Sequence, residues 1–220
     1  MLTIDLINKN IPRLKLQDTV GKALQLIVDY KVSHLPVVSE NKFVGLLSEE
    51  DLLDQDDEKT PVELLQKNFT FTSVQHNVHF LNAVNCSIQF DTTVVPVINK
   101  ENDFIGAITS RDLLKNLGNF AGADEIGGII VIEMLPSQFS ISEISRIVES
   151  NDCSILHLNT TIHPIDGILT LTIHLNKREI ATVVATFERY DYDVTYFYGN
   201  EKFDNEINSN YQHLMNFLDI

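Results

Sequence analysis

The sequence contains few cysteines and no long apolar run. Its two cysteines, Cys86 and Cys153, each lie within an apolar pattern, so we expect free, buried thiols in reducing surroundings rather than a disulfide. No stretch approaches the ~18 to 20 consecutive apolar residues that a membrane helix needs, and the N-terminus lacks a basic-then-apolar signal pattern. We therefore expect a soluble, cytoplasmic protein that does not associate with a membrane.

Basic residues are also scarce. The chain has 16 Lys and Arg against 31 Asp and Glu, which gives a formal net charge of -15. Because the neutralisation of phosphates requires clustered Lys and Arg, this balance argues against general nucleic-acid binding. An anionic ligand would need a local basic pocket. The acidic run at residues 49–58 is interpreted as a solvated helix end and linker.

Signatures of catalysis are missing. The chain has no Gly-x-Ser-x-Gly elbow, no phosphate-cradling Gly-rich loop and no pattern of a Cys nucleophile, so we do not expect an enzyme. His76-x-x-His79 has the spacing of metal ligands, but no nearby Cys, Asp or Glu completes a recognisable set. We predict neither a metal site nor a required cofactor.

The N-terminal half contains an internal repeat. Leu35-Pro36-Val37-Val38 is echoed sixty residues later by Val95-Pro96-Val97-Ile98. A second block, at residues 45–53, matches residues 106–114, sixty-one positions on. Both copies of this block read Gly, two apolar residues, Ser or Thr, two variable residues and then Asp-Leu-Leu. Two similar half-domains therefore lie in tandem.

Each copy is expected to form a helix, a strand, a turn, a second strand and another helix, with the first helix at about 19–30 or 77–89. This pattern resembles the CBS domain, whose copies pair into a pseudo-symmetric disc, and the resemblance covers roughly residues 1–120. CBS modules that bind adenosine compounds commonly hold the ribose hydroxyls with the Asp of the second block, since a carboxylate accepts two hydrogen bonds from a cis-diol. The adjacent helix N-terminus favours phosphate, and the strand that carries the proline could sandwich the adenine.

The resemblance therefore implies two pockets for an adenosine ligand such as AMP, ADP, ATP or S-adenosylmethionine. Their implied ligand-binding residues are Thr109, Arg111, Asp112, Pro96 and Val97 in one pocket, and Ser48, Asp51, Pro36 and Val37 in the other.

Helix capping is the alternative interpretation of the same motif. Ser48-x-x-Asp51 and Thr109-x-x-Asp112 are near matches to a capping box, with Asp in place of the usual Glu or Gln. A cap needs no ligand, but the two roles are compatible because the same side chains can serve both.

The two copies differ in charge. Arg111 and Lys115 flank Asp112 and can share one helix face, whereas Glu49 and Glu50 occupy the corresponding point of the first copy. We therefore expect the second-repeat site to take a phosphate-bearing nucleotide. The first site would be vacant, bind a neutral or cationic derivative such as S-adenosylmethionine, or require a metal.

The C-terminal third has a different pattern. A glycine-containing connector precedes strand, helix, strand, strand, helix and strand, including a helix capped by Ser140 and another that Asn176 could cap. This order describes a ferredoxin-like fold and looks like the ACT domain of CBS-ACT regulatory proteins, including acetoin-utilisation-type proteins. ACT modules often bind an amino acid near a glycine in the first strand-to-helix loop, but residues 135–139 contain none.

The predicted fold class is α+β, a tandem CBS pair plus a ferredoxin-like βαββαβ domain. The predicted boundaries are 1–58 for CBS repeat 1, 59–120 for CBS repeat 2, 121–127 for a connector, 128–199 for the ACT-like domain and 200–220 for a helical tail.

Three functional hypotheses remain. The first is a homodimeric regulatory sensor that binds an adenosine compound and relays to the ACT-like domain or to a client protein that the sequence does not name. The second is a structural or interaction subunit whose pockets bind no ligand. The third is an enzyme with an unrecognised site.

Overall fold

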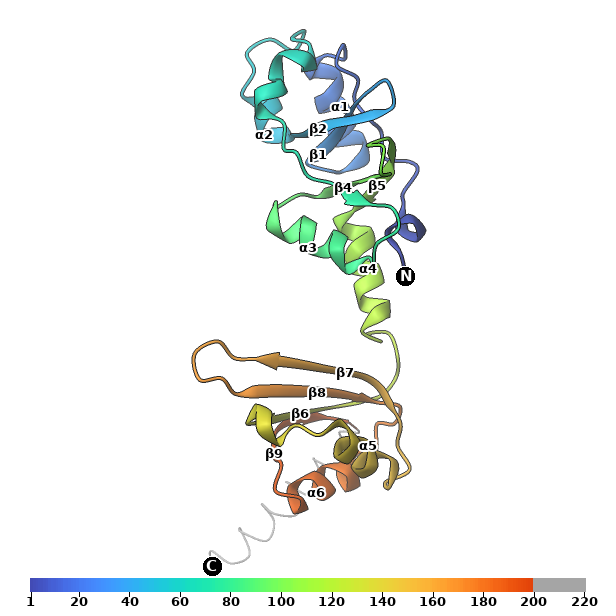
Figure 1. Ribbon diagram of the computed structural model, residues 1–220, viewed down its shortest axis with the longest axis vertical. Helices are drawn as coiled ribbons and strands as arrows, with labels where there is room; N and C mark the ends of the chain where they lie inside the picture. Colours follow the sequence, from blue (N-terminus) through green and yellow to red (C-terminus); the bar gives the residue numbers. More distant parts are fainter. Residues whose placement is uncertain (200–220) are drawn as a thin grey trace, which may run out of the picture. The chain divides into compact units, whose positions relative to one another are not determined.

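The computed structural model describes residues 1–199 and separates into two compact units, Met1–Leu117 and a second unit that begins at Gly118 (Figure 1). The predicted helical tail, residues 200–220, lies outside the described residues. Within residues 1–199, no helix combines the length and the apolar character needed to cross a membrane. Both units mix helices with antiparallel strands, so the predicted α+β class is confirmed.

The first unit contains the succession helix, strand, strand, helix twice, and the additional strand β3 opens the second copy. The first copy consists of α1 (Val20–Tyr30), β1 (His34–Ser39), β2 (Lys42–Ser48) and α2 (Glu49–Leu53). The second copy consists of β3 (Val74–Gln75), α3 (Leu81–Gln89), β4 (Val94–Ile98), β5 (Phe104–Thr109) and α4 (Ser110–Phe120). Two short 3-10 helices, η1 (Thr3–Leu6) and η2 (Val62–Asn68), precede the two copies.

The helix predicted to begin at residue 77 begins later, at Leu81. The N-terminal segment of the chain accounts for the difference, because it holds the residues just before α3. The Phe80 N–H donates to the Met1 carbonyl at 3.3 Å, and Leu2 forms a bridge with His79. These contacts keep this stretch as a turn.

The two 3-10 segments cross between the copies. The segment that contains η1 packs against the second copy, and the segment that contains η2 packs against the first. The Asn8 N–H donates to the Ala107 carbonyl of the second copy at 2.8 Å. Leu46 and Thr70 exchange two backbone hydrogen bonds of 2.9 Å, which attach the segment after η2 to the first copy. Each half in space therefore includes a segment that lies on the other side of residue 58 in the sequence.

Glycines allow these close approaches. A Cβ atom at Gly106 would lie 2.4 Å from Cγ2 of Ile7, and one at Gly45 would lie 2.7 Å from Cβ of Phe69. The glycine that opens each repeated block is therefore required where the crossing segment passes.

The second unit contains one four-stranded antiparallel sheet. Its elements are β6 (Gly128–Met134), η3 (Pro136–Gln138), α5 (Ile141–Glu149), β7 (Ile155–Ile162), β8 (Leu169–Leu175), α6 (Ala181–Arg189) and β9 (Asp193–Tyr198). The strand order is β7-β8-β6-β9. The predicted succession of strand, helix, strand, strand, helix and strand is observed.

One face of this sheet forms the core of the second unit. The apolar residues that alternate along β8 are buried together with Ile130, Ile132 and Phe187, and α5 and α6 lie against this face (Figure 1). Ser140 caps α5 as predicted, because its Oγ accepts the Glu143 N–H at 3.4 Å. Both cysteines are free and buried, as expected.

Asn176 does not cap the next helix. Helix α6 begins only at Ala181, and the Asn176 side chain instead accepts the Ser154 N–H at 2.8 Å. The prediction was wrong because this contact between the ends of β7 and β8 uses the amide oxygen that a cap would need.

Candidate functional site

The second-repeat motif lies where β5 meets α4. The Asp112 N–H donates to Thr109 Oγ1 at 3.0 Å, and the Thr109 hydroxyl donates to Asp112 Oδ2 at 2.7 Å. The amide of Asn8 donates to the same Oδ2 at 3.2 Å. Asp112 Oδ1 accepts no hydrogen bond from residues 1–199. One carboxylate oxygen at the start of α4 is therefore available to a ligand.

The first-repeat motif has the same local geometry but a different second contact. The Asp51 N–H donates to Ser48 Oγ at 3.1 Å, and the Ser48 hydroxyl donates back to Asp51 Oδ2. The amide of Asn68 donates to the other oxygen, Oδ1, at 2.8 Å. Both oxygens of Asp51 are thus engaged within the protein.

Both motifs cap a helix. In each copy the Ser or Thr hydroxyl accepts the N–H of the Asp three positions on, which satisfies one of the free N–H groups of the first turn. The Asp carboxylate does not return to the backbone N–H of the capping residue, as a full capping box would require; it accepts the hydroxyl hydrogen. Capping therefore accounts for the hydroxyl but leaves the open oxygen of Asp112 unexplained.

A cleft of about 520 Å³ lies beside the first motif. Its lining residues are Ser33, His34, Ser48, Glu49, Glu50, Leu53, Asp54 and Asp91. Four of these eight side chains are carboxylates, and His34 is the one group that can become positive. Burial lowers the pKa of His34, and the nearby Asp91 and Asp51 charges oppose this effect. The cleft is therefore acidic at neutral pH.

The repeat interval identifies the equivalent positions in the second copy. The Glu49 N–H donates to the Ser33 carbonyl at 2.8 Å, and the Ser110 N–H donates to the Thr93 carbonyl at 2.9 Å, so the starts of α2 and α4 are held in the same way. Asp91 corresponds to Lys31. Asp91 follows the C-cap of α3 and has a φ of 45°, and Lys31 is the C-cap of α1 and has a φ of 53°.

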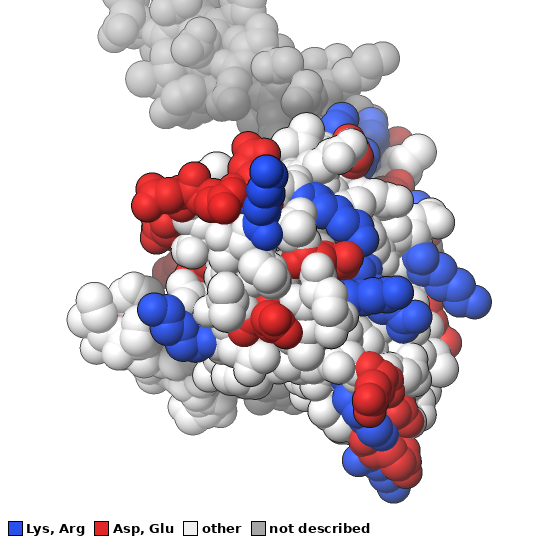
Figure 2. All heavy atoms as spheres, turned by 90° about the horizontal axis from the view of Figure 1, so that it is seen from above, with Lys and Arg blue, Asp and Glu red and all other residues white. Residues whose placement is uncertain are grey.

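The charges at these equivalent positions are reversed. By the repeat interval, Glu50, Asp54 and Asp91 of this cleft correspond to Arg111, Lys115 and Lys31. The three cations are exposed and form no ion pair within the part of the chain that the structure describes. Figure 2 shows acidic side chains grouped at the upper left and again at the lower right of the face in view, with Lys and Arg side chains between these groups and beside the second.

The strand residues implied by the resemblance are placed inside the protein. Val37 and Val97 are fully buried, each within a hydrophobic cluster of its own copy. Pro36 and Pro96 are buried in β1 and β4. Any contact of the two valines with a ligand would have to use their backbone, because their side chains face the core.

Several residues at the two motifs were not found from the sequence. Asn8 and Asn68 each donate to a motif Asp, and His34 and Asp91 line the acidic cleft. The two asparagines are sixty residues apart, which is the interval of the repeat. Extending the comparison of the two copies upstream of the Pro-Val strands would have revealed this pair.

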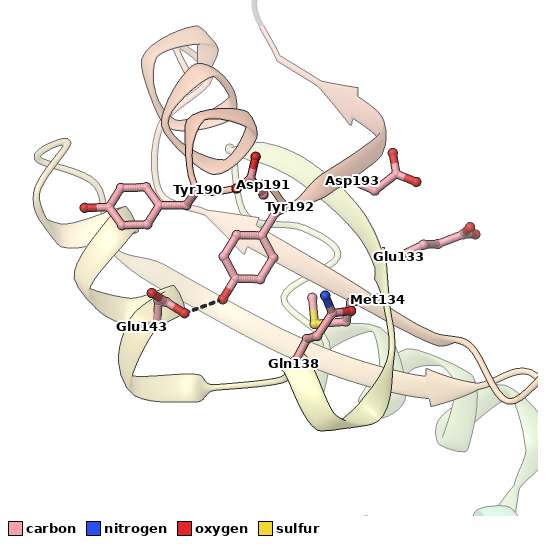
Figure 3. A pocket seen from close by; sticks show the side chains of 8 residues that line it. All are labelled: Glu133, Met134, Gln138, Glu143, Tyr190, Asp191, Tyr192 and Asp193. Atoms are coloured by element: carbon pink, nitrogen blue, oxygen red, sulfur yellow. Dashed lines mark hydrogen bonds between the residues drawn. The ribbon is translucent and has the colours of Figure 1, made fainter.

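The second unit has a separate pocket of about 390 Å³ (Figure 3). Its lining residues are Glu133, Met134, Gln138, Glu143, Tyr190, Asp191, Tyr192 and Asp193. The Tyr192 hydroxyl donates to Glu143 Oε2 at 2.9 Å. Burial and the Glu143 carboxylate raise the pKa of Tyr192 to about 12. With four carboxylates around it, this pocket disfavours an anionic group.

The family comparison agrees with the repeat. Residues 4–58 and 73–119 match the family model of the CBS domain, so the two copies form a tandem CBS pair.

Two relatives with known names each match half of the chain. Inosine-5'-monophosphate dehydrogenase of Methanocaldococcus jannaschii is 29% identical over 113 residues, which cover 50% of this chain and 22% of that protein. Homoserine O-acetyltransferase of Methanobrevibacter ruminantium is 27% identical over 112 residues, with coverage of 50% and 22%. The chain thus spans about a fifth of the length of these relatives, and the match to the dehydrogenase is confined to the CBS region.

Among solved structures, a CBS domain pair/ACT domain protein from Thermotoga maritima is similar, with a TM-score of 0.49 and 20% sequence identity. The similarity covers 55% of this chain and 98% of that one.

Proposed function

We propose that the tandem CBS pair carried by this chain is a regulatory sensor for an adenosine compound, with a phosphate-bearing nucleotide bound at the second-repeat motif. CBS pairs are generally regulatory and bind adenosine ligands. The sensor relays occupancy to the second unit or to a client protein and performs no chemistry on the ligand.

The open oxygen of Asp112 carries this proposal. It is a carboxylate oxygen without a partner in residues 1–199, at the start of an eleven-residue helix, beside a cation on the preceding residue and another three residues on. Asp112 Oδ1 accepts a ribose hydroxyl, and Arg111 and Lys115 neutralise the phosphate. The helix N-terminus adds a favourable field for the same anion.

The first-repeat motif is proposed to reject polyphosphates. Both oxygens of Asp51 are engaged, and the adjoining cleft carries the carboxylates of Glu49, Glu50 and Asp54. Close charges of one sign repel each other, most strongly where water is partly excluded. A neutral or cationic derivative such as S-adenosylmethionine fits this cleft better than AMP or ATP.

The second unit is proposed to be a ferredoxin-like, ACT-like domain within a homodimer. The βαββαβ order and the strand order β7-β8-β6-β9 support the assignment. The pocket at the end of β6 is lined by carboxylates, which would repel the carboxylate of a free amino acid. We therefore assign this domain to signal relay and assembly rather than to amino-acid sensing.

Calorimetric titration with AMP tests the nucleotide site. Asp112→Ala should weaken AMP binding by roughly tenfold or more, because the ribose loses its acceptor. Asp51→Ala is the matched control in the other copy and should leave the AMP affinity unchanged. The assignment is wrong if only the Asp51 variant loses affinity.

A thermal-shift panel separates the sensor from the scaffold hypothesis. AMP, ADP, ATP and S-adenosylmethionine are compared, since a ligand at about 100 times its dissociation constant stabilises the native state by about 2.7 kcal/mol. If none of the four raises the melting temperature, the chain is better described as a structural or interaction subunit whose motifs serve only as helix caps.

A further inference from the structure

The second copy contains a pocket of about 300 Å³ that shares no residue with either Ser/Thr-x-x-Asp motif. One wall is the segment of residues 72–75, which ends with β3, and the other wall is a flank of α3. Thr72 Oγ1 lies 3.0 Å from Cys86 Sγ, and this buried contact joins the two walls. The volume is at the lower end of the range for pockets that bind small molecules.

The wall that ends with β3 carries an acceptor without a partner. The side-chain oxygen Oε1 of Gln75 is buried and accepts no hydrogen bond from residues 1–199. A buried amide oxygen normally has a donor, which is either a protein group or a bound molecule. Because Gln75 lines the pocket, a ligand inside it can supply this donor.

The wall formed by α3 is lined with amides. Asn82, Asn85 and Gln89 recur at spacings of three and four, so they share one flank of the helix. All three residues are exposed, and the side-chain amides of Asn85 and Gln89 make no hydrogen bond with another described residue. Each amide offers two donors and an acceptor. Phe90, the C-cap of α3, is 43% exposed and adds an apolar surface to this wall.

None of the ten lining residues carries a charge. Burial raises the pKa of Cys86, which keeps its thiol neutral. The two copies can be compared here because Leu14 pairs with Val37 in the first copy as Val74 pairs with Val97 in the second, so the interval of sixty residues holds at this wall.

The first copy is charged at the equivalent positions. Three of its residues, Lys15, Lys22 and Asp29, stand sixty residues before three of the pocket amides. Lys22 also forms an ion pair with Asp18 at 2.7 Å. The uncharged lining is therefore a property of the second copy and not of the repeat.

An uncharged pocket favours an uncharged ligand. A charged group that enters it loses hydration and meets no opposite charge in compensation. Hydrogen-bonding groups on two walls suit a ligand with hydroxyl groups around a ring, because each hydroxyl can both donate and accept. The apolar face of such a ring can lie against Phe90.

We propose that this pocket binds a neutral monosaccharide, with one sugar hydroxyl donating to Gln75 Oε1 and others contacting the amides of α3. The site is additional to the proposed adenosine sensor and does not depend on it. A second small molecule would then act on the same CBS pair.

Two-dimensional NMR of the full-length protein without nucleotide tests the binding. D-glucose, D-galactose and D-mannose are titrated separately, and at least one of them should shift the side-chain amide signals of Gln75 and Asn85 in a saturable way. The amino sugar and the uronic acid of the sugar that binds should each bind at least about tenfold more weakly, because the pocket offers no opposite charge. About 150 mM NaCl screens the long-range effect of the net charge.

Gln75→Leu tests the buried acceptor. It should weaken sugar binding about tenfold, because the hydroxyl loses its partner, and it should leave the AMP affinity unchanged. It should not lower the melting temperature of the ligand-free protein, since the replaced oxygen has no protein donor. Asp112→Ala should do the reverse, weakening AMP and sparing the sugar, so failure of either site is distinguishable from failure of the other.

Asn85→Leu tests the amide wall, and Gln25→Leu is its matched control. Gln25 is the exposed amide at the equivalent position of α1. Only Asn85→Leu should weaken sugar binding, and circular dichroism with thermal melting checks that both variants are folded.

Four results would overturn the proposal. They are the absence of a saturable shift with any of the three sugars, shifts caused by adenine but by none of the sugars, sugar binding that Gln75→Leu does not change, and a lower melting temperature of ligand-free Gln75→Leu. The last result would show that the protein itself already satisfies the Gln75 amide.

Discussion

The two motif aspartates show how one neighbouring side chain changes what a carboxylate can do. Asp51 and Asp112 both contact the hydroxyl of the capping residue, but Asn68 takes the second oxygen of Asp51, whereas Asn8 shares the oxygen of Asp112 that already accepts from Thr109. A carboxylate with both oxygens satisfied gains little from a ligand, because a new hydrogen bond must replace an existing one. Asp112 has no such cost.

His34 makes a residue-scale prediction about pH. Its Nδ1 accepts the Thr93 N–H at 3.3 Å, a contact between the two copies that needs the neutral ring. Burial lowers the pKa of His34 in the folded state below the value of about 6.5 for an unfolded chain. The unfolded chain therefore binds a proton first on acidification. The stabilisation is present above about pH 6.5 and is lost as the pH falls through the folded pKa.

Urea unfolding at about pH 7.5 and about pH 5 measures this effect. The wild-type free energy of unfolding should fall more between these pH values than that of His34→Asn, which keeps a neutral acceptor and retains the other six histidines. Equal falls in the two proteins would show that His34 does not couple the copies to pH.

At the scale of elements, the crossing segments connect the fold to the site. The Asn8 N–H donates to the Ala107 carbonyl of β5, and the absence of a side chain at Gly106 lets this segment pass close to the strand. The same segment carries the Asn8 amide that donates to Asp112. A change in the packing of this segment therefore reaches the candidate site without any substitution of a motif residue.

Gly106→Ala tests this connection. The new Cβ would lie 2.4 Å from Ile7 Cγ2, so the crossing segment must shift, and overpacking of this kind costs about 1–3 kcal/mol of stability. Ile7→Ala removes the opposing methyl group and should recover part of the loss when combined with Gly106→Ala. Chemical denaturation of the single and double variants gives the coupling. Strictly additive effects would show that the two side chains do not meet.

At the scale of the whole molecule, each unit has its own hydrophobic core. Phe187 is fully buried in the cluster of the second unit, and Phe80 is fully buried in a cluster of the first. Separate cores permit separate cooperative unfolding.

Differential scanning calorimetry should therefore resolve two transitions. Phe187→Ala should destabilise the second unit by about 3–5 kcal/mol, and Phe80→Ala should destabilise the first unit by a similar amount, because each truncation leaves a cavity in one core. AMP should raise the midpoint temperature of only one transition, the one whose midpoint Phe80→Ala lowers. A single transition that responds equally to both truncations would contradict two independent cores.

The sequence by itself determined the features that depend on near neighbours. The repeat, the start of a helix at each Ser/Thr-x-x-Asp motif and the alternation along β8 follow from local hydrogen bonds and from the period of the apolar residues. These rules act over a few positions, which is why they can be applied before the fold is known. Even so, Asn176 failed as a cap because its partner, Ser154, is distant in the chain.

Only the tertiary structure decided which residues surround each motif. Asn8 reaches Asp112 across 104 positions, and Asp91 joins the cleft of the first copy from the second. The same folding buried the side chains of Val37 and Val97 in the cores of their copies, where they cannot contact a ligand. The physical reason is that the segments cross between the halves, so the partners of each carboxylate are set by packing over long chain separations rather than by local spacing.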